Sequence, residues 1–462
     1  MTDFIRNKKQ LIEREKVESE ARRLALEAME AALASVNPQH LLRGRLKLEG
    51  DFLRIDHLSV DLKEVEGIYV FGGGKASAAM AEALYEVLGD RLTEGIIVAP
   101  KYQERAFRTG PIWLVKAGHP IPTVEAPNAV SKMLELADRL GERDLAFCLI
   151  SGGGSALMAS PTGGVSLEEK QDITRALLKS GATIHEINTV RKHLSQVKGG
   201  RLAGRIYPAE TVGLIISDVV GDSLETIASG PTAPDPTTFR DAVAVLKKYR
   251  LWDNAPEAVR KTLEEGVGGL IPESPKPSEE VFRKVHNFIL GNNELACRSA
   301  SEYLNSRGVE ASVLTVFLEG EAREAGRVIA AMAKYLKPKP EAKDRSIILG
   351  GETTVKVKGE GKGGRNQELV LSACRLIEGV KGLAIAAVDT DGVDGYTEAA
   401  GGIVDGYTLS QAREAGLDAD FYLQNNDSHS FLDKLGDTIM TGPTGTNVND
   451  LIVAVRVSSE GG

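Results

Sequence analysis

Four residues, Gly72–Lys75 (GGGK), have the types and spacing of a loop that holds an anion. They follow the apolar run 68–71 and precede an alanine-rich stretch typical of a helix. Adjacent glycines let backbone N–H groups approach an anion, the helix start adds positive potential, and Lys75 adds a full charge. Ala76 stands where a Walker A loop carries its magnesium-binding hydroxyl, so the loop is not of that type. The alternative is that the glycines serve only tight packing and that Lys75 is solvated.

A second glycine-rich loop follows the apolar run 145–150 in the same way. It offers two hydroxyl groups but no cation, and Gly153 stands where a hydrolase would carry its nucleophilic serine. We interpret the loop as a phosphate cradle, with a tight turn as the alternative. Its residues are Ser151, Gly152, Gly153, Gly154 and Ser155.

The segment Gly359–Gly364 fits the pattern GxGxxG, but its surroundings do not suit a dinucleotide-binding loop. It follows the charged stretch TTVKVK, and no acidic residue ends a strand about 20 residues further on. We therefore predict a flexible turn that delivers Arg365 to the start of a helix. A guanidinium there can bind phosphate oxygens in a bidentate manner. The alternative is an exposed arginine at a helix start.

Two loops carry clustered aspartates, SDVVGD at 217–222 and DTDGVDG at 389–395. Carboxylates at strand ends can hold Mg²⁺ through one or two oxygens, with water completing the shell. The second loop is not an EF-hand, because Val393 occupies its fifth position. Asp218 and Asp391 are our candidate metal ligands, and Asp-Gly turn chemistry is the alternative.

Two further polar residues are candidates for substrate or phosphate binding. Lys192 belongs to a basic helix predicted near residues 188–202, close to Gly199 and Gly200. A basic face of this kind is more often solvated than functional. Its basic residues are Arg191, Lys192, Lys198 and Arg201. The other candidate is Asn292, in the GNN loop that follows an apolar strand at 288–290.

One pattern recurs along the chain and would position all of these loops. A short apolar strand leads into a loop of Gly, Ser, Asn or Asp, and a helix usually follows. Such alternation predicts an α/β fold with mainly parallel sheets covered by helices. Ligands then lie at the carboxyl ends of the strands. We also predict an opening helix from about Arg14 to Ser35, and a helix from the capping box at 166–169 to about Lys179.

The length of 462 residues favours two or three domains, and composition changes at 231–238 (PTAPDPTT). We predict an N-terminal α/β domain at 1–238, with both glycine-rich loops, and a C-terminal α/β domain at 239–462, with the GGRNQE and DTDG loops. The formal net charge of −9 argues against nucleic acid as a partner. Apolar runs fall short of the ~18 residues that cross a bilayer, and the N-terminal segment is too charged for a secretory signal. We therefore expect a cytoplasmic protein without a membrane partner.

Several segments resemble the motifs of class II glycerate kinases (the glycerate 2-kinase, or MOFRL, family). They run in the family's order from about residue 70 to the C-terminus: GGGKASAAMAEAL, LISGGGSALM, EINTVRKHLSQVKGGRLA, SDVVGDSLETIASGPT, LGGETTVKVKGEGKGGRNQELVLSA, DTDGVDGYTEAAGGIVD and TGPTGTNVNDLIV. The resemblance implies phosphorylation of D-glycerate by ATP to 2-phosphoglycerate, with Mg²⁺ or another divalent cation. It also implies two α/β domains, the second MOFRL-like, with the active site in the cleft between them.

The resemblance further implies roles for two residues. The family's essential lysine falls on Lys75, and its essential arginine falls on Arg365. We hypothesise that Lys75 binds the glycerate carboxylate or the migrating phosphoryl group, and that Arg365, from the other domain, stabilises its charge as the cleft closes. The chain departs from the family at Asp389, where relatives often have Gly, and at His429, where Tyr is expected.

Other functions stay open at this stage. The product could be 3-phosphoglycerate, the activity could be reduction of hydroxypyruvate, or the protein could be a non-catalytic sensor of phosphorylated sugars. The missing nucleotide fingerprint argues against the reductase. A homodimer is also left open as an assembly.

Overall fold

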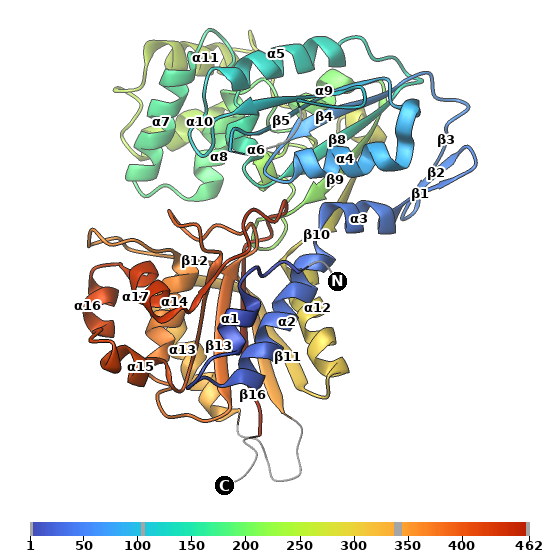
Figure 1. Ribbon diagram of the computed structural model, residues 1–462. Helices are drawn as coiled ribbons and strands as arrows, with labels where there is room; N and C mark the ends of the chain where they lie inside the picture. Colours follow the sequence, from blue (N-terminus) through green and yellow to red (C-terminus); the bar gives the residue numbers. More distant parts are fainter. Residues whose placement is uncertain (1–2, 103–106, 337–343, 459–462) are drawn as a thin grey trace. The chain divides into compact units, whose positions relative to one another are not determined.

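The computed structural model describes residues 3–102, 107–336 and 344–458, and the chain divides into two compact units (Figure 1). The central unit comprises Leu41–Leu290, and the terminal unit comprises Met1–His40 with Gly291–Gly462. This division differs from the predicted boundary at residue 238. Residues 239–290 stay with the central unit because a helix pair packs there and a strand extends its sheet, whereas the opening helix packs in the terminal unit.

The central unit is built on a seven-stranded sheet with the order β10-β9-β8-β4-β5-β7-β6. Parallel pairing joins β4 to β5 and β8, β5 to β7, and β8 to β9. The strands are β4 (Ile68–Gly73), β5 (Glu94–Pro100), β6 (Arg108–Thr109), β7 (Ile112–Ala117), β8 (Leu145–Ser151), β9 (Glu210–Ile216) and β10 (Val285–Gly291). The order reverses between β4 and β8, and in doubly wound sheets ligands bind at the carboxyl ends beside this reversal. Both glycine-rich loops leave the sheet at this point.

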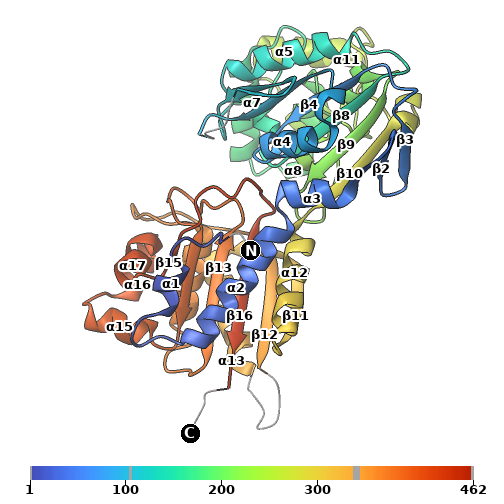
Figure 2. The ribbon, with the colours of Figure 1, turned by 45° about the vertical axis from the view of Figure 1, so that its right-hand side comes forward.

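Helices cover this sheet and form a further layer with its own apolar core (Figure 1). They are α3 (Pro38–Arg45), α4 (Ser77–Leu88), α5 (Glu125–Ala137), α6 (Gly154–Leu157), α7 (Leu167–Lys179), α8 (Ile184–His193), α9 (Arg201–Ile206), α10 (Phe239–Lys248) and α11 (Glu257–Val267). The capping box predicted for α7 is confirmed, since Ser166 Oγ accepts a hydrogen bond from the Glu169 amide. A small antiparallel sheet that the sequence analysis did not predict lies between α3 and β4 in the chain (Figure 2): β1 (Leu46–Glu49), β2 (Phe52–Ile55) and β3 (Leu58–Asp61).

The single helix predicted near 188–202 is wrong. The chain forms α8 and α9 with an irregular segment between them. α8 ends at His193, and Gly199 and Gly200 precede α9 with φ values of 58° and 77°, a left-handed conformation that glycine adopts without strain. The basic residues therefore lie on two elements and the connection between them.

The terminal unit has a six-stranded mixed sheet with the order β11-β12-β16-β13-β14-β15. Its strands are β11 (Glu310–Glu321), β12 (Arg345–Thr354), β13 (Leu383–Asp389), β14 (Gly401–Asp405), β15 (Thr438–Ile439) and β16 (Asp450–Arg456). β11 and β12 are parallel, whereas β16 enters between β12 and β13 and is antiparallel to both. The predicted α/β class is confirmed, with parallel pairing dominating the central sheet and a mixed sheet here.

Helices lie on both faces of the terminal sheet (Figure 2). They are α1 (Lys8–Ile12), α2 (Ser19–Ser35), α12 (Asn293–Ser306), α13 (Ala322–Tyr335), α14 (Arg365–Cys374), α15 (Thr408–Glu414), α16 (Ala419–Gln424) and α17 (Ser428–Leu435). Leu383, Ile385 and Ala387 alternate along β13 and share a core with α13 and α14, whereas α2 packs on the same sheet beside α12. The predicted opening helix is confirmed at its end, although α2 begins five residues later than expected. Among the described residues, no helix is both long enough and apolar enough to span a membrane.

Candidate functional site

The two glycine-rich loops of the central unit are joined by hydrogen bonds. The Lys75 amide donates to the Gly152 carbonyl oxygen over 2.8 Å, and the Ala76 amide donates to Ser151 Oγ over 2.9 Å. A Cβ on Gly74 would lie 2.2 Å from Ser151 Oγ, so only glycine permits this approach. Ser151 is fully buried, and its hydroxyl holds the Lys75 loop in place. Phosphate binding by Ser151 stays a prediction.

Gly153 brings the second loop against two side chains that can carry charge. A Cβ on Gly153 would lie 2.8 Å from His119 Nε2 and 3.3 Å from Lys75 Cγ. A Cβ on Gly154 would lie 2.6 Å from the Gly73 carbonyl oxygen. These glycines therefore pack closely against their neighbours, and the same packing sets the Lys75 side chain beside the second loop. The phosphate cradle at residues 151–155 stays a prediction.

Ser155 lies at the centre of a cluster that the sequence analysis missed. Lys198 Nζ donates to Ser155 Oγ over 2.7 Å and to its carbonyl oxygen over 2.9 Å, and Arg191 Nη2 also donates to the hydroxyl. Ser229 Oγ lies 3.1 Å from Ser155 Oγ. We call Ser155, Arg191, Lys198 and Ser229 the Ser155 cluster. The second loop has no cation in its own sequence, but two cationic side chains from the segment after residue 190 donate hydrogen bonds to it.

The prediction that these basic residues form a solvated face is wrong for the Ser155 cluster. Lys198 is 1% exposed and Arg191 is half-buried. Burial lowers the pKa of Lys198 well below its usual range, and the charges of Arg191 and Lys170 lower it further. Burial also lowers the pKa of Arg191 to about 10. The sequence signal for this arrangement is the glycine pair at 199–200, whose left-handed conformation prevents one continuous helix and precedes α9.

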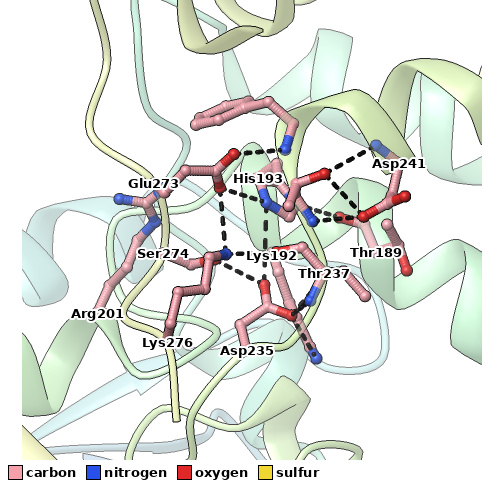
Figure 3. A network of polar contacts seen from close by, with 12 residues as sticks. Thr189, Lys192, His193, Arg201, Asp235, Thr237, Asp241, Glu273, Ser274 and Lys276 are labelled. Carbon is pink, nitrogen blue, oxygen red and sulfur yellow. Dashed lines mark hydrogen bonds and ion pairs between the residues drawn. The ribbon is translucent and has the colours of Figure 1, made fainter. Parts of the chain in front are cut away.

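Lys192 has a different environment, shown in Figure 3. Its Nζ lies 3.3 Å from Oδ1 of the fully buried Asp235, which also accepts hydrogen bonds from Thr237 Oγ1 at 2.6 Å and Ser274 Oγ at 2.9 Å. Burial favours the neutral acid, but the Thr237 hydrogen bonds and the Lys192 charge lower the pKa of Asp235 below its ordinary value. The network holds α8 against the two loops that carry these three partners. Lys192 is neutralised here, so a role in phosphate binding stays a prediction.

In the terminal unit, Arg365 is surrounded by three carboxylates from three strand ends. Its Nε donates to Asp450 Oδ1 over 2.8 Å, Nη1 to Glu352 Oε1 over 2.7 Å, and Nη2 to Asp389 Oδ2 over 2.9 Å. Burial acts to lower the pKa of the guanidinium, but the three carboxylates raise it above its ordinary value. These three carboxylates therefore orient Arg365. Asp389 is a position where the chain departs from the family pattern, whereas the sequence analysis did not single out Asp450 or Glu352.

Burial raises the pKa of Asp450 to about 6, and the charge of Arg365 only partly opposes this shift. The carboxylate also accepts a hydrogen bond from Asn366 Nδ2 over 2.7 Å. An aspartate that titrates near neutral pH therefore contacts the arginine that the sequence singled out.

The loop before Arg365 is pinned rather than flexible, because its glycines contact backbone closely. The Gly361 amide donates to the Asn425 carbonyl oxygen over 2.9 Å, and a Cβ on Gly364 would lie 2.2 Å from Asp394 Cγ. Asp394 accepts hydrogen bonds from the amide of Gln367 and thereby caps α14. Gln367 Oε1 in turn lies 2.9 Å from Nδ1 of His429, the residue that departs from the family pattern.

Two further candidate residues accept local backbone hydrogen bonds. Asn292 caps α12, since its Oδ1 accepts a hydrogen bond from the Leu295 amide over 2.9 Å. Asp391 Oδ1 accepts a hydrogen bond from the Val393 amide over 2.9 Å, within the DTDGVDG turn. Asp218 is half-buried in the central unit, whereas Asp391 belongs to the terminal unit. Within the described ranges, no group of three or more His, Cys, Asp or Glu residues could hold a metal ion.

The reversal of strand order, with two interlocked loops at the carboxyl edge, defines an α/β protein that binds a small ligand at the end of a doubly wound sheet. Comparison with known proteins narrows this class. A domain of unknown function (DUF4147) matches residues 24–264, and the MOFRL family matches residues 345–450.

The D-glycerate 2-kinase of Thermotoga maritima is 44% identical over 438 residues, covering 94% of this chain and 98% of that protein. The glycerate 2-kinase of Pyrococcus horikoshii is 42% identical over 443 residues, covering 95% and 98%. A crystal structure of glycerate kinase from Thermotoga maritima superposes with a TM-score of 0.83 at 42% identity, covering 94% of this chain and 99% of that one. The chain belongs to the class II glycerate kinase family, which contains the MOFRL domain.

Proposed function

We propose that this protein is a glycerate 2-kinase, which transfers the γ-phosphoryl group of ATP to D-glycerate and yields ADP and 2-phosphoglycerate. The observation that carries the proposal is the near full-length similarity to the D-glycerate 2-kinase of Thermotoga maritima. The site chemistry agrees with it. Phosphoryl transfer depends mainly on positioning and on neutralising charge, and it requires no protein nucleophile.

Lys75 is the first residue to which we assign a role. Its ammonium group would neutralise the glycerate carboxylate or the transferred phosphoryl group. Support comes from its position after a loop at the carboxyl end of β4 and from the hydrogen bond between its amide and Gly152. A fixed backbone keeps the charge directed before the substrate binds, and such preorganisation makes charge stabilisation effective. Residues 151–155 would cradle a phosphate, with Ser155 supplied with cations by Arg191 and Lys198.

Arg365 is the second residue to which we assign a role. Three of its five N–H groups donate to carboxylates, and the remaining N–H groups on Nη1 and Nη2 could donate to phosphate oxygens. The carboxylates fix the plane of the side chain, so little rotamer entropy is lost when it binds an anion. We propose that Arg365 stabilises charge on the transferred phosphoryl group. It belongs to a different compact unit from Lys75, and kinetics must show whether both act on one step.

We propose that Mg²⁺ binds to this protein as a complex with the nucleotide. The described residues form no three-ligand cluster, and Mg²⁺ is commonly bound by one or two carboxylates together with substrate phosphates. Asp218 or Asp391 would supply such a carboxylate. When bound, the cation would neutralise charge on the phosphates. Removal of divalent cations by a chelator should stop ADP release, and added Mg²⁺ should restore it.

The decisive experiment measures ADP release from ATP with D-glycerate and identifies the product by phosphorus NMR. A signal from 2-phosphoglycerate supports the proposal, whereas 3-phosphoglycerate would reassign the acceptor hydroxyl. Oxidation of NADH with hydroxypyruvate would establish a reductase, and an absence of ADP release would favour a phosphosugar-binding protein. We further expect the enzyme to work in the cytoplasm, where ATP is supplied. Light scattering on the purified chain would test for a homodimer.

A further inference from the structure

A pocket of about 240 Å³ lies beside the Ser155 cluster in the central unit. Its wall comes from the segment after β7, from α6 and α7, and from α8 and the segment that follows it. The lining residues include Ile121, Ser155, Lys170, Leu178, Arg191 and Lys198. Ser155 belongs both to this wall and to the second glycine-rich loop, so the pocket and the loop form one continuous surface.

Four cationic side chains line this pocket. Arg175 pairs with Asp172, whereas Lys170, Arg191 and Lys198 have no carboxylate to neutralise them among the described residues. Lys170, which is 5% exposed, donates to the Leu194 carbonyl oxygen over 2.7 Å, and Lys198 donates to Ser155. Arg191 donates to Ser155 and to an amide oxygen of Asn188 at 3.3 Å. Within the part of the chain that the structure describes, none of the three cations forms an ion pair with Asp or Glu. Lys192, on the same helix as Arg191, pairs with the buried carboxylate of Asp235. The lack of a carboxylate partner is therefore a property of the residues that line the pocket.

Charged groups buried near one another without a counter-ion are unfavourable, and proteins normally pair them. Burial and the charge of Arg191 lower the pKa of Lys170 well below its usual range, in the same way as that of Lys198. A bound anion would remove this penalty, because it would supply the missing negative charge to all three groups. The side chains therefore form a site that is complementary to a polyanion.

Most of the remaining wall is apolar, although Gln171 and Thr174 also line it, and this indicates what else the ligand carries. Ile121 and Leu178 are 69% and 62% exposed, and Pro120, Pro122 and Leu167 also contribute to the wall. An apolar surface next to buried cations suits a ligand with a flat apolar part and a multiply charged part. D-glycerate has no apolar part, whereas a nucleotide has both.

We propose that this pocket binds the nucleoside triphosphate, with the base against Ile121 and Leu178 and phosphate oxygens at Lys170, Arg191 and Lys198. The inference rests on the proposed kinase activity and assigns the nucleotide to the central unit. Ligand pockets for drug-sized molecules usually measure about 300–1,000 Å³, so this pocket would hold part of the nucleotide. The remaining phosphates would extend past Ser155 along the second glycine-rich loop.

The test is the affinity of the full-length protein for ADP, measured by titration calorimetry without D-glycerate. Lys170→Met and Lys198→Met keep most of the length of the side chain and remove its charge. Each should weaken ADP binding by at least about tenfold, the loss expected for one charge-assisted hydrogen bond. Lys179→Met, a change at an exposed position on the same helix as Lys170, should leave the affinity unchanged. Binding of D-glycerate should be unchanged in all three variants.

A second set of measurements distinguishes the contribution of the base to binding from that of the phosphates. Leu178→Ser should weaken binding of ADP but not of inorganic tripolyphosphate, whereas Lys170→Met should weaken both. Wild-type ADP affinity in folded Lys170→Met protein, or a loss of D-glycerate affinity instead, would overturn the assignment. If ADP binding depends on these residues but no ADP is released with D-glycerate, the nucleotide site stands and the proposed kinase function fails.

Discussion

The backbone amide of Lys75 donates a hydrogen bond of 2.8 Å to the carbonyl oxygen of Gly152. A residue in the loop after β4 is thereby positioned by the loop after β8, and these strands are neighbours in the sheet. The candidate phosphate-binding residue therefore depends on a contact between segments that are far apart in the sequence. Several consequences can be measured on the purified protein.

Replacing Lys75 with Ala should lower kcat by at least ~10²-fold, the usual loss when one preorganised charge contact is removed. The assay is ADP release with saturating D-glycerate. Lys132→Ala is the matched control, because Lys132 lies at an exposed position on α5. A double variant with Arg365→Ala should lose little more than the worse single variant if both residues act on one step. Near-normal kcat in Lys75→Ala would refute its role.

Replacing Arg365 with Lys should also lower kcat by ~10²-fold, although the positive charge is kept. A lysine ammonium is a point charge, and it cannot reproduce a planar guanidinium that donates to three carboxylates. Arg375→Lys provides the control, since Arg375 lies at the other end of α14 and pairs with the exposed Asp420. If kcat survives the change at Arg365, charge alone is sufficient there and the bidentate contact is not required.

The stability contribution of Asp450 should depend on pH. Its pKa of about 6 lies above the value of 3.8 for an ordinary aspartate, because burial disfavours the charged form. The folded protein then binds a proton that the unfolded chain lacks between these values, so the charged carboxylate destabilises the fold above pH 6. This penalty should disappear as pH falls from 6 towards 4, by up to about 1.4 kcal/mol per pH unit.

Asp450→Asn should remove this dependence, and the measurement is urea unfolding of both proteins at several pH values. We expect the wild-type protein to gain stability relative to the variant as pH decreases from 7 to 4. A constant difference across this range would show that Asp450 has the same pKa in the folded and unfolded states.

Ser151→Ala should destabilise the fold by about 1–3 kcal/mol, because the buried Ala76 amide loses its acceptor. It should also lower kcat, since the same hydrogen bond holds the Lys75 loop. Urea unfolding and the ADP-release assay give the two values. Ser155→Ala should behave differently, with weaker ADP binding and a smaller change in stability. Equal stability of Ser151→Ala and the wild-type protein would exclude this structural role.

Arg22→Met should destabilise the terminal unit by about 3–5 kcal/mol. Arg22 is fully buried, and it pairs with Asp405 at 2.5 Å and Asp437 at 2.7 Å, both also fully buried. Loss of the arginine would leave the Asp405 carboxylate without its counter-ion, and Asp437 would keep only its pair with Arg14. Arg23→Met, at the next position, removes only partly exposed pairs and should cost less than ~1 kcal/mol. Similar unfolding curves for both variants would contradict this account.

Local sequence patterns were sufficient to predict the α/β class, the capped helix α7 and the end of the opening helix. These features follow from local patterns: continuous apolar strands, a capping box and a proline after Asn37. The sequence also located both glycine-rich loops at strand ends, since a strand, a loop and a helix start are adjacent in the chain. The basic residues after position 188 were visible too, but their burial was not.

Which of these segments contact one another follows from tertiary packing and could not be predicted from local patterns. The Ser155 cluster combines residues from the loop after β8, from the end of α8 and from the segment near Ser229, and no spacing in the sequence relates them. The three carboxylates around Arg365 come from separate strands for the same reason. The division into units was likewise missed, because the first forty residues pack with the last part of the chain. Long-range packing is set by the sum of many weak contacts across the whole chain, and local periodicity does not encode it.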